Sequence, residues 1–282
     1  RGPFTSVAAL TDGLTAAYPS MPAHTTPRAL GRFGVPQKGD IRTIDDGKGN
    51  GANRATYLVE TIASPTFAFP AVVARAVFVA AAAAGLPMPP MVSSLADLMM
   101  AYRTIPTSQP WYTSVAFFNP SPAGGASPRV EYYYLPGHNF GLTAAVVNFN
   151  RYPELVVVAA RALAATPLDH YVDDFICADL AAGGESCTAV TCALVESMGS
   201  GEPFSGERVR APTLDPDKQS DTLPTNTIRR VDADLSRVTS ERAVFFSSTL
   251  ERRRSILKDF RGAYERGRLT SAEASKLRGR LF

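Results

Sequence analysis

The chain has 282 residues, 45% of them hydrophobic and 20% charged, a composition that excludes an intrinsically disordered protein and suits one large or two ordinary domains. Its formal net charge of +3 is too small to indicate a partner by itself. That value averages two parts of opposite charge. Residues 1–205 have 12 basic and 15 acidic side chains, an acidic balance suited to cations. Residues 206–282 have 17 basic and 11 acidic side chains, a basic balance suited to a polyanion.

The first ninety residues predict little regular structure before one helix. Residues 1–37 are rich in Pro, Gly, Ser and Thr, which predicts an irregular lead-in. Residues 38–53 are polar and Gly-rich and predict a loop with one short strand over 41–44. Residues 69–86 are Ala- and Val-rich with Pro70 in the favourable first turn, so they predict a buried helix. At about 15 helical residues this segment is too short to cross a bilayer.

The middle of the chain alternates apolar runs with turn residues, which predicts a mixture of strands and helices. Residues 142–165 favour a helix by length and alanine content, although a proline lies inside them. The expected elements are a strand with a helical turn (91–102), a hairpin (111–118 and 129–135), a helix (142–165), a tight hairpin (168–180), a helix (185–198) and a loop-rich stretch (199–227).

The last fifty residues predict two helices. An S/T-x-x-E capping box occurs at Ser248 with Glu251 and again at Thr270 with Glu273. Three arginines at 252–254 crowd the first turn of the first helix, where the helix dipole disfavours positive charge unless an anion is near. Apolar side chains recur on one face of each helix: Leu250, Leu257, Phe260 and Tyr264 on the first, and Ala274, Leu277 and Leu281 on the second.

Residue counts exclude several other chemistries. Cys177, Cys187 and Cys192 are odd in number and form no C-x-x-C, so we expect small buried hydrophobic residues rather than disulfides or a zinc site. The three histidines are too scattered for a zinc site built on imidazole. No segment has the order of a signal peptide, and the start at Arg1 indicates a processed or partial product. We expect a soluble intracellular protein, in the cytoplasm or nucleus, with no membrane partner.

The residues most informative about function are acidic. Asp173 and Asp174 are adjacent at the tip of a predicted hairpin, where two carboxylates repel each other unless a cation is near. Asp97 ends another predicted strand. Three carboxylates from two strands form a hard-oxygen site suited to Mg²⁺. Two such ions about 4 Å apart can activate an attacking hydroxyl and stabilise a leaving pyrophosphate oxygen.

These aspartates lie in segments that resemble the motifs of reverse transcriptases, in the order that the family has them. The resemblance covers roughly residues 38–282. The segments are RTIDDGKGNGAN (42–53) for the fingers motif, DLMMAYRTIP (97–106) for the first catalytic motif, NFGLTAAVVNFNR (139–151) for the next, YVDDF (171–175) for Tyr-x-Asp-Asp, LDPDKQS (214–220) for the palm motif ending in Lys, and TSAEASKLRGRLF (270–282) for the segment after the polymerase core.

The resemblance implies a catalytic role for each matching residue. Asp97 and Asp173 would bind both metal ions, Mg²⁺ or Mn²⁺, and Asp174 would complete the acidic cluster. Tyr102 would pack under the incoming sugar and clash with a 2′-hydroxyl, which selects deoxynucleotides. Lys218 would lie near the pyrophosphate as a proton donor. Positioning and electrostatic stabilisation, rather than covalent catalysis, would carry the reaction.

The resemblance also implies where nucleotide and template would lie. Arg42 would sit over the triphosphate, where its forked guanidinium suits charge-assisted contacts, with Lys38 beside it. Phe140 and Gly141 would lie against the nucleotide and template, because a glycine allows the backbone to approach closely.

The fold that the resemblance implies is an α+β right-hand polymerase core, with fingers, a palm whose antiparallel sheet is backed by helices, and a partial helical thumb or connection. The implied function is that of a retroelement's RNA-directed DNA polymerase, with a primed RNA or DNA template and dNTPs as partners. The expected divisions are an irregular lead-in (1–37), fingers (38–90), a palm with a fingers insertion near 107–135 (91–225), and a partial thumb or connection (226–282).

Departures from the family pattern leave an alternative open. Asn139 stands where many relatives have Pro, Gly47 where an aromatic often occurs, and residues 227–230 replace the Phe-Leu-Gly before the strand that grips the primer. A non-enzymatic descendant that only binds nucleic acid is therefore the alternative. Val172 and Tyr102 argue against an RNA-dependent RNA polymerase, and a metal-dependent phosphohydrolase explains none of the motif order.

Overall fold

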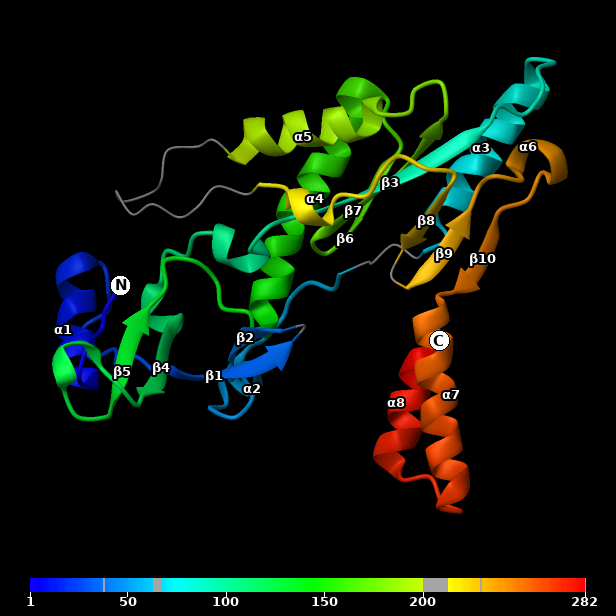
Figure 1. Ribbon diagram of the computed structural model, residues 1–282. Coiled ribbons are helices and arrows are strands. Elements are labelled where there is room, and N and C mark those ends of the chain that lie inside the picture. The colour runs from blue at the N-terminus through cyan, green and yellow to red at the C-terminus, as the bar shows by residue number, and fades with distance from the viewer. Residues whose placement is uncertain (38, 63–66, 200–212, 229, 282) are drawn as a thin grey trace.

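The computed structural model describes residues 1–37, 39–62, 67–199, 213–228 and 230–281. These residues form an α+β fold with one four-stranded sheet and two three-stranded sheets, as Figure 1 shows. The four-stranded sheet and α1 stand on one side, a central sheet lies under α4 and α5, and the C-terminal strands lead into two projecting helices. No helix in these ranges is both long enough and apolar enough to cross a membrane.

The four-stranded sheet combines segments far apart in sequence, in the order β2-β1-β4-β5. β1 pairs antiparallel with β2 and parallel with β4. β4 and β5 pair antiparallel, which confirms the hairpin predicted for this part of the chain. The strands are β1 (Leu30–Gln37), β2 (Asp40–Asp45), β4 (Ser114–Asn119) and β5 (Arg129–Tyr134).

Residues 1–37 are more regular than their composition predicts. They contain α1 (Val7–Ala17) as well as β1, so the expectation of an irregular lead-in was wrong. The hydroxyl of the N-cap Ser6 accepts a hydrogen bond from the N–H of Ala9 at 3.1 Å. Leu10 and Leu14 of α1 are fully buried in a cluster with a tryptophan and a tyrosine from beyond residue 110. Tertiary packing thus stabilises a helix whose local signal is weak.

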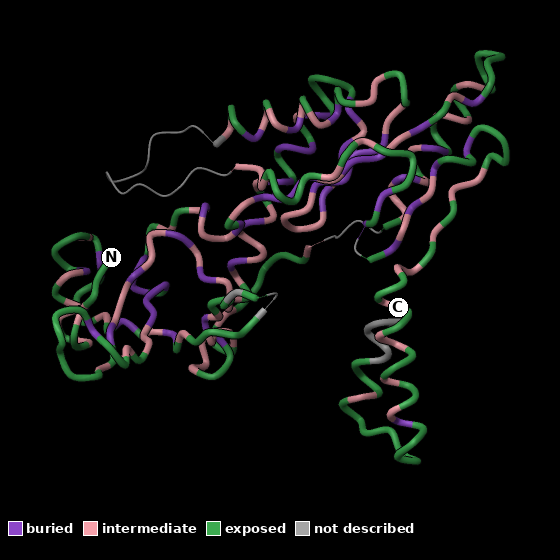
Figure 2. The backbone as a smooth tube through the Cα atoms, viewed as in Figure 1, coloured by how far each residue is buried: buried purple, intermediate pink, exposed green. Residues whose placement is uncertain are grey.

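The central sheet has the antiparallel order β3-β7-β6 and lies against α4 and α5. β7 is buried along most of its length, because the helices cover one face and C-terminal strands pack on the other. Buried residues accordingly concentrate here in Figure 2. The elements are β3 (Met91–Asp97), β6 (Leu168–Tyr171), β7 (Asp174–Leu180), α4 (Thr143–Ala164) and α5 (Ser186–Gly199), and they confirm the predicted strand, hairpin and helices.

Helix α4 continues through Pro153, whose missing N–H removes one helical hydrogen bond. Its N-cap, Leu142, has no side chain able to accept a hydrogen bond. The amide of Asn53 does so instead, because its Oδ1 accepts the N–H of Thr143 at 2.9 Å. The start of α4 is therefore fastened to the loop after β2, 90 residues earlier in the chain.

A third sheet, in the order β10-β9-β8, is formed by strands after residue 224 and packs against the central one. Ile228 and Ala233 of this sheet are buried against Ile176 of β7. A helix that begins beside Pro70, as predicted, packs against Leu235 and Val238, which lie between β9 and β10. The elements are α3 (Phe69–Ala83), β8 (Thr225–Ile228), β9 (Val231–Asp234), α6 (Val238–Glu241) and β10 (Phe245–Ser248).

The C-terminal helices α7 (Leu250–Glu265) and α8 (Ser271–Leu281) confirm the two predicted helices and project from the body (Figure 1). Thr249, not Ser248, caps α7, since its hydroxyl accepts the N–H of Arg252 at 3.3 Å. The second capping box is confirmed by reciprocal bonds between residues 270 and 273. The predicted apolar face of α7 stays exposed, as Figure 2 also shows for most of this helix.

Two of the cysteines are joined. Cys177 of β7 and Cys187 of α5 form a disulfide, whereas Cys192 is free and partly buried. The expectation of three reduced cysteines was therefore wrong, because an odd count does not reveal that a strand and a helix will bring one pair together. Short helical segments complete the described chain: α2 (Ala52–Ala55), η1 (Ala101–Thr104), η2 (Pro110–Tyr112), η3 (Ala123–Gly125) and η5 (Pro216–Lys218).

Candidate active site

The central sheet brings three aspartates together at one end. In the β3–β7 ladder Asp97 is the register partner of Asp174. Tyr171 pairs with Asp174 across the β6–β7 hairpin, so the turn has two residues, and Asp173 is the second. The N–H of Leu98 donates to the carbonyl of Asp173 at 2.8 Å and ties the chain after β3 to this turn.

The turn holds an unfavourable backbone conformation. Val172, its first residue, has a φ of 56°, in the left-handed region that a β-branched residue rarely adopts. Such strain costs on the order of 1–3 kcal/mol and persists only where the surroundings enforce it. Strand pairing before and after the turn enforces it here, which holds the adjacent carboxylates in place.

Burial and like charge raise the pKa of two of these carboxyl groups. Burial, followed by the charge of Asp97, raises the pKa of Asp173. Burial, followed by the charge of Asp173 and a hydrogen bond with Asp97, raises the pKa of Asp174 to about 7. A cation bound among the three groups would relieve this repulsion, so the cluster favours binding one.

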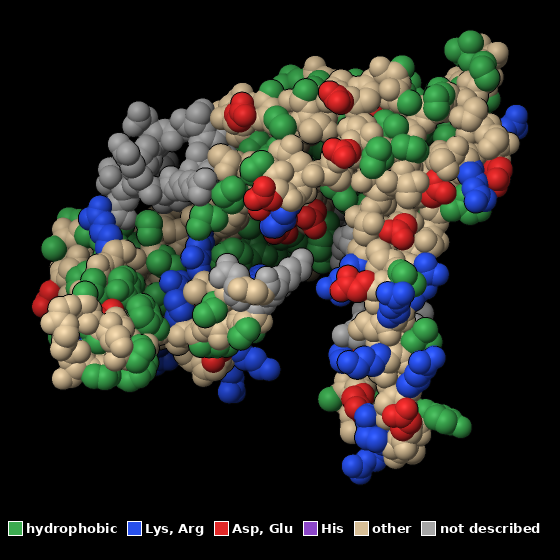
Figure 3. Space-filling model, in the orientation of Figure 1, with side chains coloured by type: hydrophobic (Ala, Val, Ile, Leu, Met, Phe, Trp, Pro, Cys, Tyr) green, Lys and Arg blue, Asp and Glu red, His purple; other side chains and the backbone are tan. Residues whose placement is uncertain are grey.

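The ammonium group of Lys218 already lies against the cluster. Its Nζ is 2.7 Å from Oδ1 of Asp97 and 3.4 Å from Oδ2 of Asp215, the N-cap of η5. Burial would lower the pKa of Lys218, but its hydrogen bonds and charge attraction to these two carboxylates outweigh burial and raise the pKa. Figure 3 shows acidic and basic side chains next to one another at the rim of the hollow beside the α7–α8 arm.

The donor set fits Mg²⁺ or Mn²⁺ if the substrate supplies further ligands. Carboxylate oxygens are the ligands that these hard cations prefer, and an ammonium now stands beside one of them. Among the described residues, no three His, Cys, Asp or Glu side chains converge closely enough to hold a metal ion by themselves. Mg²⁺ typically takes one or two carboxylates together with substrate phosphates. Asp97 and Asp173 would hold it in this way, with Asp174 completing the acidic cluster.

Tyr102 lies in an aromatic cluster next to the carboxylates. Its ring centroid is 5.1 Å from that of Phe140 and 5.3 Å from that of Phe149. Burial, followed by the negative charge of Asp173, raises the pKa of Tyr102, so its hydroxyl lies within electrostatic reach of the cluster. The structure thus brings the predicted Tyr102 and Phe140 together beside the aspartates.

Gly141 is packed against the loop after β2. A Cβ on Gly141 would overlap the carbonyl oxygen of Asp45 and lie 2.7 Å from its carbon. Asn53 holds the same point, because its Nδ2 donates to the carbonyl of Gly141 at 2.9 Å. Gly47 lies on the other side of this contact, since its own Cβ would overlap the Gly141 carbonyl oxygen. The close approach explains Gly47, and contact of Gly141 with a nucleotide stays a prediction.

Of the two predicted triphosphate-binding cations, one can be placed. Arg42 is exposed on β2, and its positive charge lowers the pKa of Tyr102 and of Asp173 against the larger effects that raise them. The guanidinium is therefore close enough to act electrostatically on the cluster. Lys38 lies outside the described residues.

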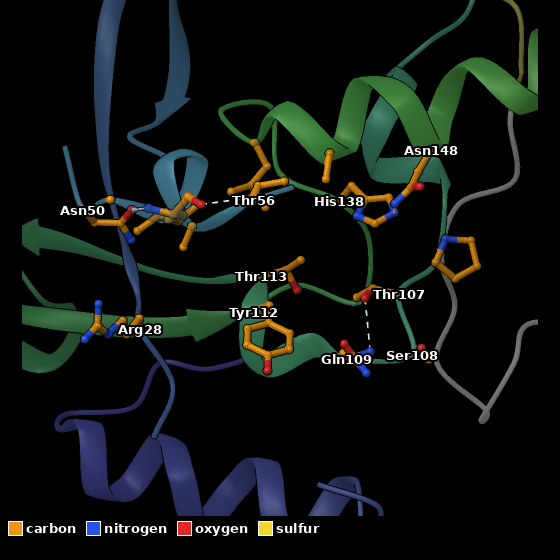
Figure 4. Close-up of a pocket in the computed structure, with 17 residues that line it drawn as sticks. Arg28, Asn50, Thr56, Thr107, Ser108, Gln109, Tyr112, Thr113, His138 and Asn148 are labelled. Atoms are coloured by element: carbon orange, nitrogen blue, oxygen red, sulfur yellow. Dashed lines mark hydrogen bonds between the residues drawn. The ribbon is translucent and has the colours of Figure 1, made fainter. Parts of the chain in front are cut away.

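A larger pocket of about 670 Å³ adjoins this region, between the loop at 50–56, the segment at 106–113 and the start of α4. Its lining, drawn in Figure 4, carries hydroxyl, amide and imidazole groups, one arginine, Arg28, and the exposed ring of Tyr112. Among the described residues that line it there is no carboxylate, so Arg28 is its charged side chain.

Two residues of this region have roles that the sequence analysis did not assign. Asp215 pairs with Lys218, whereas the sequence analysis assigned a role in the segment 214–220 only to the lysine. Asp45, read as part of the fingers motif, makes a two-bond ion pair with Arg32, Nε to Oδ1 at 2.6 Å and Nη2 to Oδ2 at 3.1 Å. The cross-strand position of Arg32 opposite Asp45 would have signalled this pair only if the β1–β2 register had been known.

Comparison with known proteins shows a fold but no sequence relative. No protein-family description and no curated protein matches the chain. A foamy viral protease-reverse transcriptase in complex with double-stranded DNA is similar over 98% of this chain, with a TM-score of 0.55 and 13% identity. A foamy viral protease-reverse transcriptase in complex with an RNA/DNA hybrid is similar over 86%, with a TM-score of 0.53 and 12% identity. The chain spans 39% and 28% of the length of those two chains. At this level of identity the similarity shows a reverse-transcriptase-like fold.

Proposed function

We propose that this chain is the core of an RNA-directed DNA polymerase that adds dNTPs to a primer 3′ end. The observation that carries the proposal is the meeting of Asp97, Asp173 and Asp174 at one end of a sheet, within a reverse-transcriptase-like fold. Crowded, partly buried carboxylates are costly for stability, and a need for divalent cations accounts for them.

Nucleic acid and dNTPs are the partners that fit the rest of the molecule. The similar solved structures are complexes with double-stranded DNA or an RNA/DNA hybrid. Residues 206–282 carry six net positive charges, and the α7–α8 arm displays many of them beside the hollow in Figure 3. The pocket of Arg28 and Tyr112 suits an unpaired template nucleotide, because the guanidinium would meet a phosphate and the ring would stack on a base.

In the proposed reaction the protein positions charged groups and makes no covalent bond with the substrate. Asp97, Asp173 and Asp174 would hold Mg²⁺, which when bound lowers the pKa of the primer hydroxyl and neutralises the leaving pyrophosphate. Arg42 would hold the triphosphate oxygens from β2. Lys218, which is protonated at neutral pH, would deliver a proton to the leaving pyrophosphate.

Tyr102 would set the preference for deoxynucleotides. Phe140 and Phe149 pack against its ring, so the ring cannot move away from a bulkier sugar without disturbing the core. A 2′-hydroxyl approaching the ring would clash with it, and the rigid support turns that clash into discrimination.

Primer extension tests the proposal. Asp173→Asn should abolish incorporation of dTTP on poly(rA)/oligo(dT) with Mg²⁺ or Mn²⁺, because it removes a metal-binding charge without changing side-chain size. Asp179→Asn, at the far end of the same strand β7, is the matched control and should extend as the wild type does. Unchanged extension by a folded Asp173→Asn variant would refute the assignment.

A second candidate, a protein that binds nucleic acid without extending it, is favoured by the β8–β9 hairpin. Asp97, Asp174 and Lys218 line a small pocket of about 160 Å³. Thr227 borders this pocket, and its hydroxyl donates to Oδ1 of Asp232 at 2.6 Å. Thr225 and Asp234 pair in the same way at 3.1 Å. Two carboxylates on this hairpin would repel the phosphates of a primer end. Salt-sensitive binding of primer–template with no incorporation in either metal would support this candidate.

A further inference from the structure

The side chain of Lys218 covers a carboxylate that is otherwise largely buried. The side chain of Asp97 is 12% exposed, whereas that of Lys218 is 57% exposed and reaches Asp97 from the solvent side. Among the described residues, Lys218 is the basic side chain that forms an ion pair with Asp97. A cation that binds Asp97 would therefore compete with this ammonium for the carboxylate.

The backbone that carries Lys218 is fastened independently of its side chain. The N–H of Asp215 donates to the carbonyl of Asp97 at 2.8 Å, and the N–H of Ser220 donates to the carbonyl of Leu95 at 3.0 Å. The hydroxyl of Ser220 accepts the N–H of Leu95 at 2.8 Å. Because these bonds lie on both sides of Lys218, its four-carbon stem can move while its backbone stays in place.

A second carboxylate lies within reach of the same ammonium. Oδ2 of Asp215 is 3.4 Å from Nζ, while its Oδ1 is occupied by the N–H of Asp217 at 3.2 Å. Asp215 belongs to the segment after residue 212 rather than to the strand ends that form the aspartate cluster. It can therefore hold the ammonium without competing for a metal ion.

We propose that Lys218 is an internal counter-ion of Asp97 that a divalent cation displaces, and that Asp215 receives the displaced ammonium. This role rests on the proposed function, because it needs Asp97 to be a metal ligand. At equal distance a doubly charged ion attracts a carboxylate twice as strongly as an ammonium does, which favours the exchange. The ammonium holds the like charges together until the metal arrives. Lys218 is thus a positioning residue that sets metal affinity.

Metal binding without nucleotide or nucleic acid tests this role directly. Lys218→Met keeps most of the stem and removes the charge, so Mn²⁺ no longer competes with an ammonium. Mn²⁺ titrations followed by electron paramagnetic resonance should show binding about three- to tenfold tighter than in the wild type, given the usual strength of a half-exposed pair. Lys258→Met on α7 is the matched control and should bind as the wild type does.

The destination of the ammonium is tested by a double-mutant cycle. Asp215→Asn in the wild-type background should weaken Mn²⁺ binding, because the displaced ammonium loses its second partner. The same change in the Lys218→Met background should have a much smaller effect, since no ammonium has to be held. Equal effects in both backgrounds would show that Asp215 acts only through its charge and would overturn its receiving role.

Failure of this role and failure of the proposed function give different results. If Lys218→Met and wild type bind Mn²⁺ equally while Asp97→Asn binds it more weakly, the counter-ion role is overturned and the metal site stands. If Asp97→Asn binds Mn²⁺ as well as the wild type, the metal site itself fails. Circular dichroism checks that each variant is folded, and Lys218→Gln replaces Lys218→Met if the latter does not fold.

Discussion

Replacing Gly141 by alanine should separate a structural role of this glycine from a substrate-binding one. In the structure the residue has no room for a side chain: a Cβ would overlap the carbonyl oxygen of Asp45 and lie 3.2 Å from the nitrogen of Gly47. These neighbours are backbone atoms, so the contact can be relieved only by moving the loop after β2 away from the start of α4.

The cost of that movement follows from what it breaks. Forcing an extra methyl into a packed site costs about 1–3 kcal/mol. The displaced loop would also lose the two hydrogen bonds of Asn53 to Gly141 and Thr143, each worth about 1 kcal/mol. Gly141→Ala should therefore lower the free energy of unfolding by roughly 3–5 kcal/mol, or the Tm by roughly 6–20 °C.

Urea denaturation and thermal unfolding measure this loss, with Gly31→Ala as the matched control. A Cβ on Gly31 meets no atom within 4 Å, so this variant should differ from wild type by less than about 0.5 kcal/mol. If Gly141→Ala proves as stable as Gly31→Ala, the reasoning is refuted. A stable Gly141→Ala with a raised KM for dNTP would instead support the nucleotide contact implied by the reverse-transcriptase motif.

Three further changes have definite expected outcomes. Without divalent cations, the free energy of unfolding should fall as pH rises from about 4 to about 7, because folding raises the pKa of Asp174 to about 7 and its ionisation then destabilises the folded state. Asp174→Asn should flatten this part of the pH profile measured by urea denaturation. An unaltered profile would contradict the prediction. Arg32→Leu should lower the free energy of unfolding by about 3 kcal/mol, because it leaves the fully buried carboxylate of Asp45 unpaired. Arg54→Leu, at an exposed site, is the control and should lower it by less than about 0.5 kcal/mol in the same urea denaturation. Equal losses in the two variants would refute the argument. Tyr112→Ala should weaken binding of a primer–template with a 5′ overhang at least fivefold in fluorescence anisotropy while sparing a blunt duplex, and an equal loss for both would remove the stacking role.

Long apolar runs made most of the central architecture predictable. The Ala/Val stretch behind Pro70, the 22-residue helix through Pro153 and the hairpin around residues 172–173 all formed where pattern and turn residues indicated. In each case the segment is long or its turn is tight, so local preference and tertiary packing agree. Asp173 and Asp174 were identifiable because adjacent carboxylates at a hairpin tip are unusual without a ligand, and Asp97 because its segment resembles a catalytic motif.

The missed features depend on contacts between distant segments. α1 and β1 lie among Gly, Pro and Thr residues, and burial of Leu10 and Leu14 stabilises the helix only after the strands beyond residue 110 have formed. The strands β8 and β9 have four residues each, with polar side chains on one face. Such short segments give too few alternations of polar and apolar residues to predict a strand. Lys218 and Asp215 are three residues apart, so their pairing is local. Its relation to the aspartate cluster is visible only once Asp97 is placed beside Lys218.

The position of the aspartates depends on polar groups buried beneath them. β7 is buried along most of its length, so alternation of polar and apolar residues cannot specify its register with β3. Buried polar groups of β3 do so instead: Ser94 bonds Thr188 of α5 at 2.9 Å, and the carbonyl of Ser93 accepts from Asn226 of β8 at 2.5 Å.

A slip by one residue would break these hydrogen bonds, each worth about 1 kcal/mol, and would also move Asp97 away from Asp174. The hydrogen bonds that make one register favourable are thus the same ones that assemble the carboxylate cluster. Substitutions at Ser94 or Asn226, which touch none of the three aspartates, should therefore alter metal binding as well as stability.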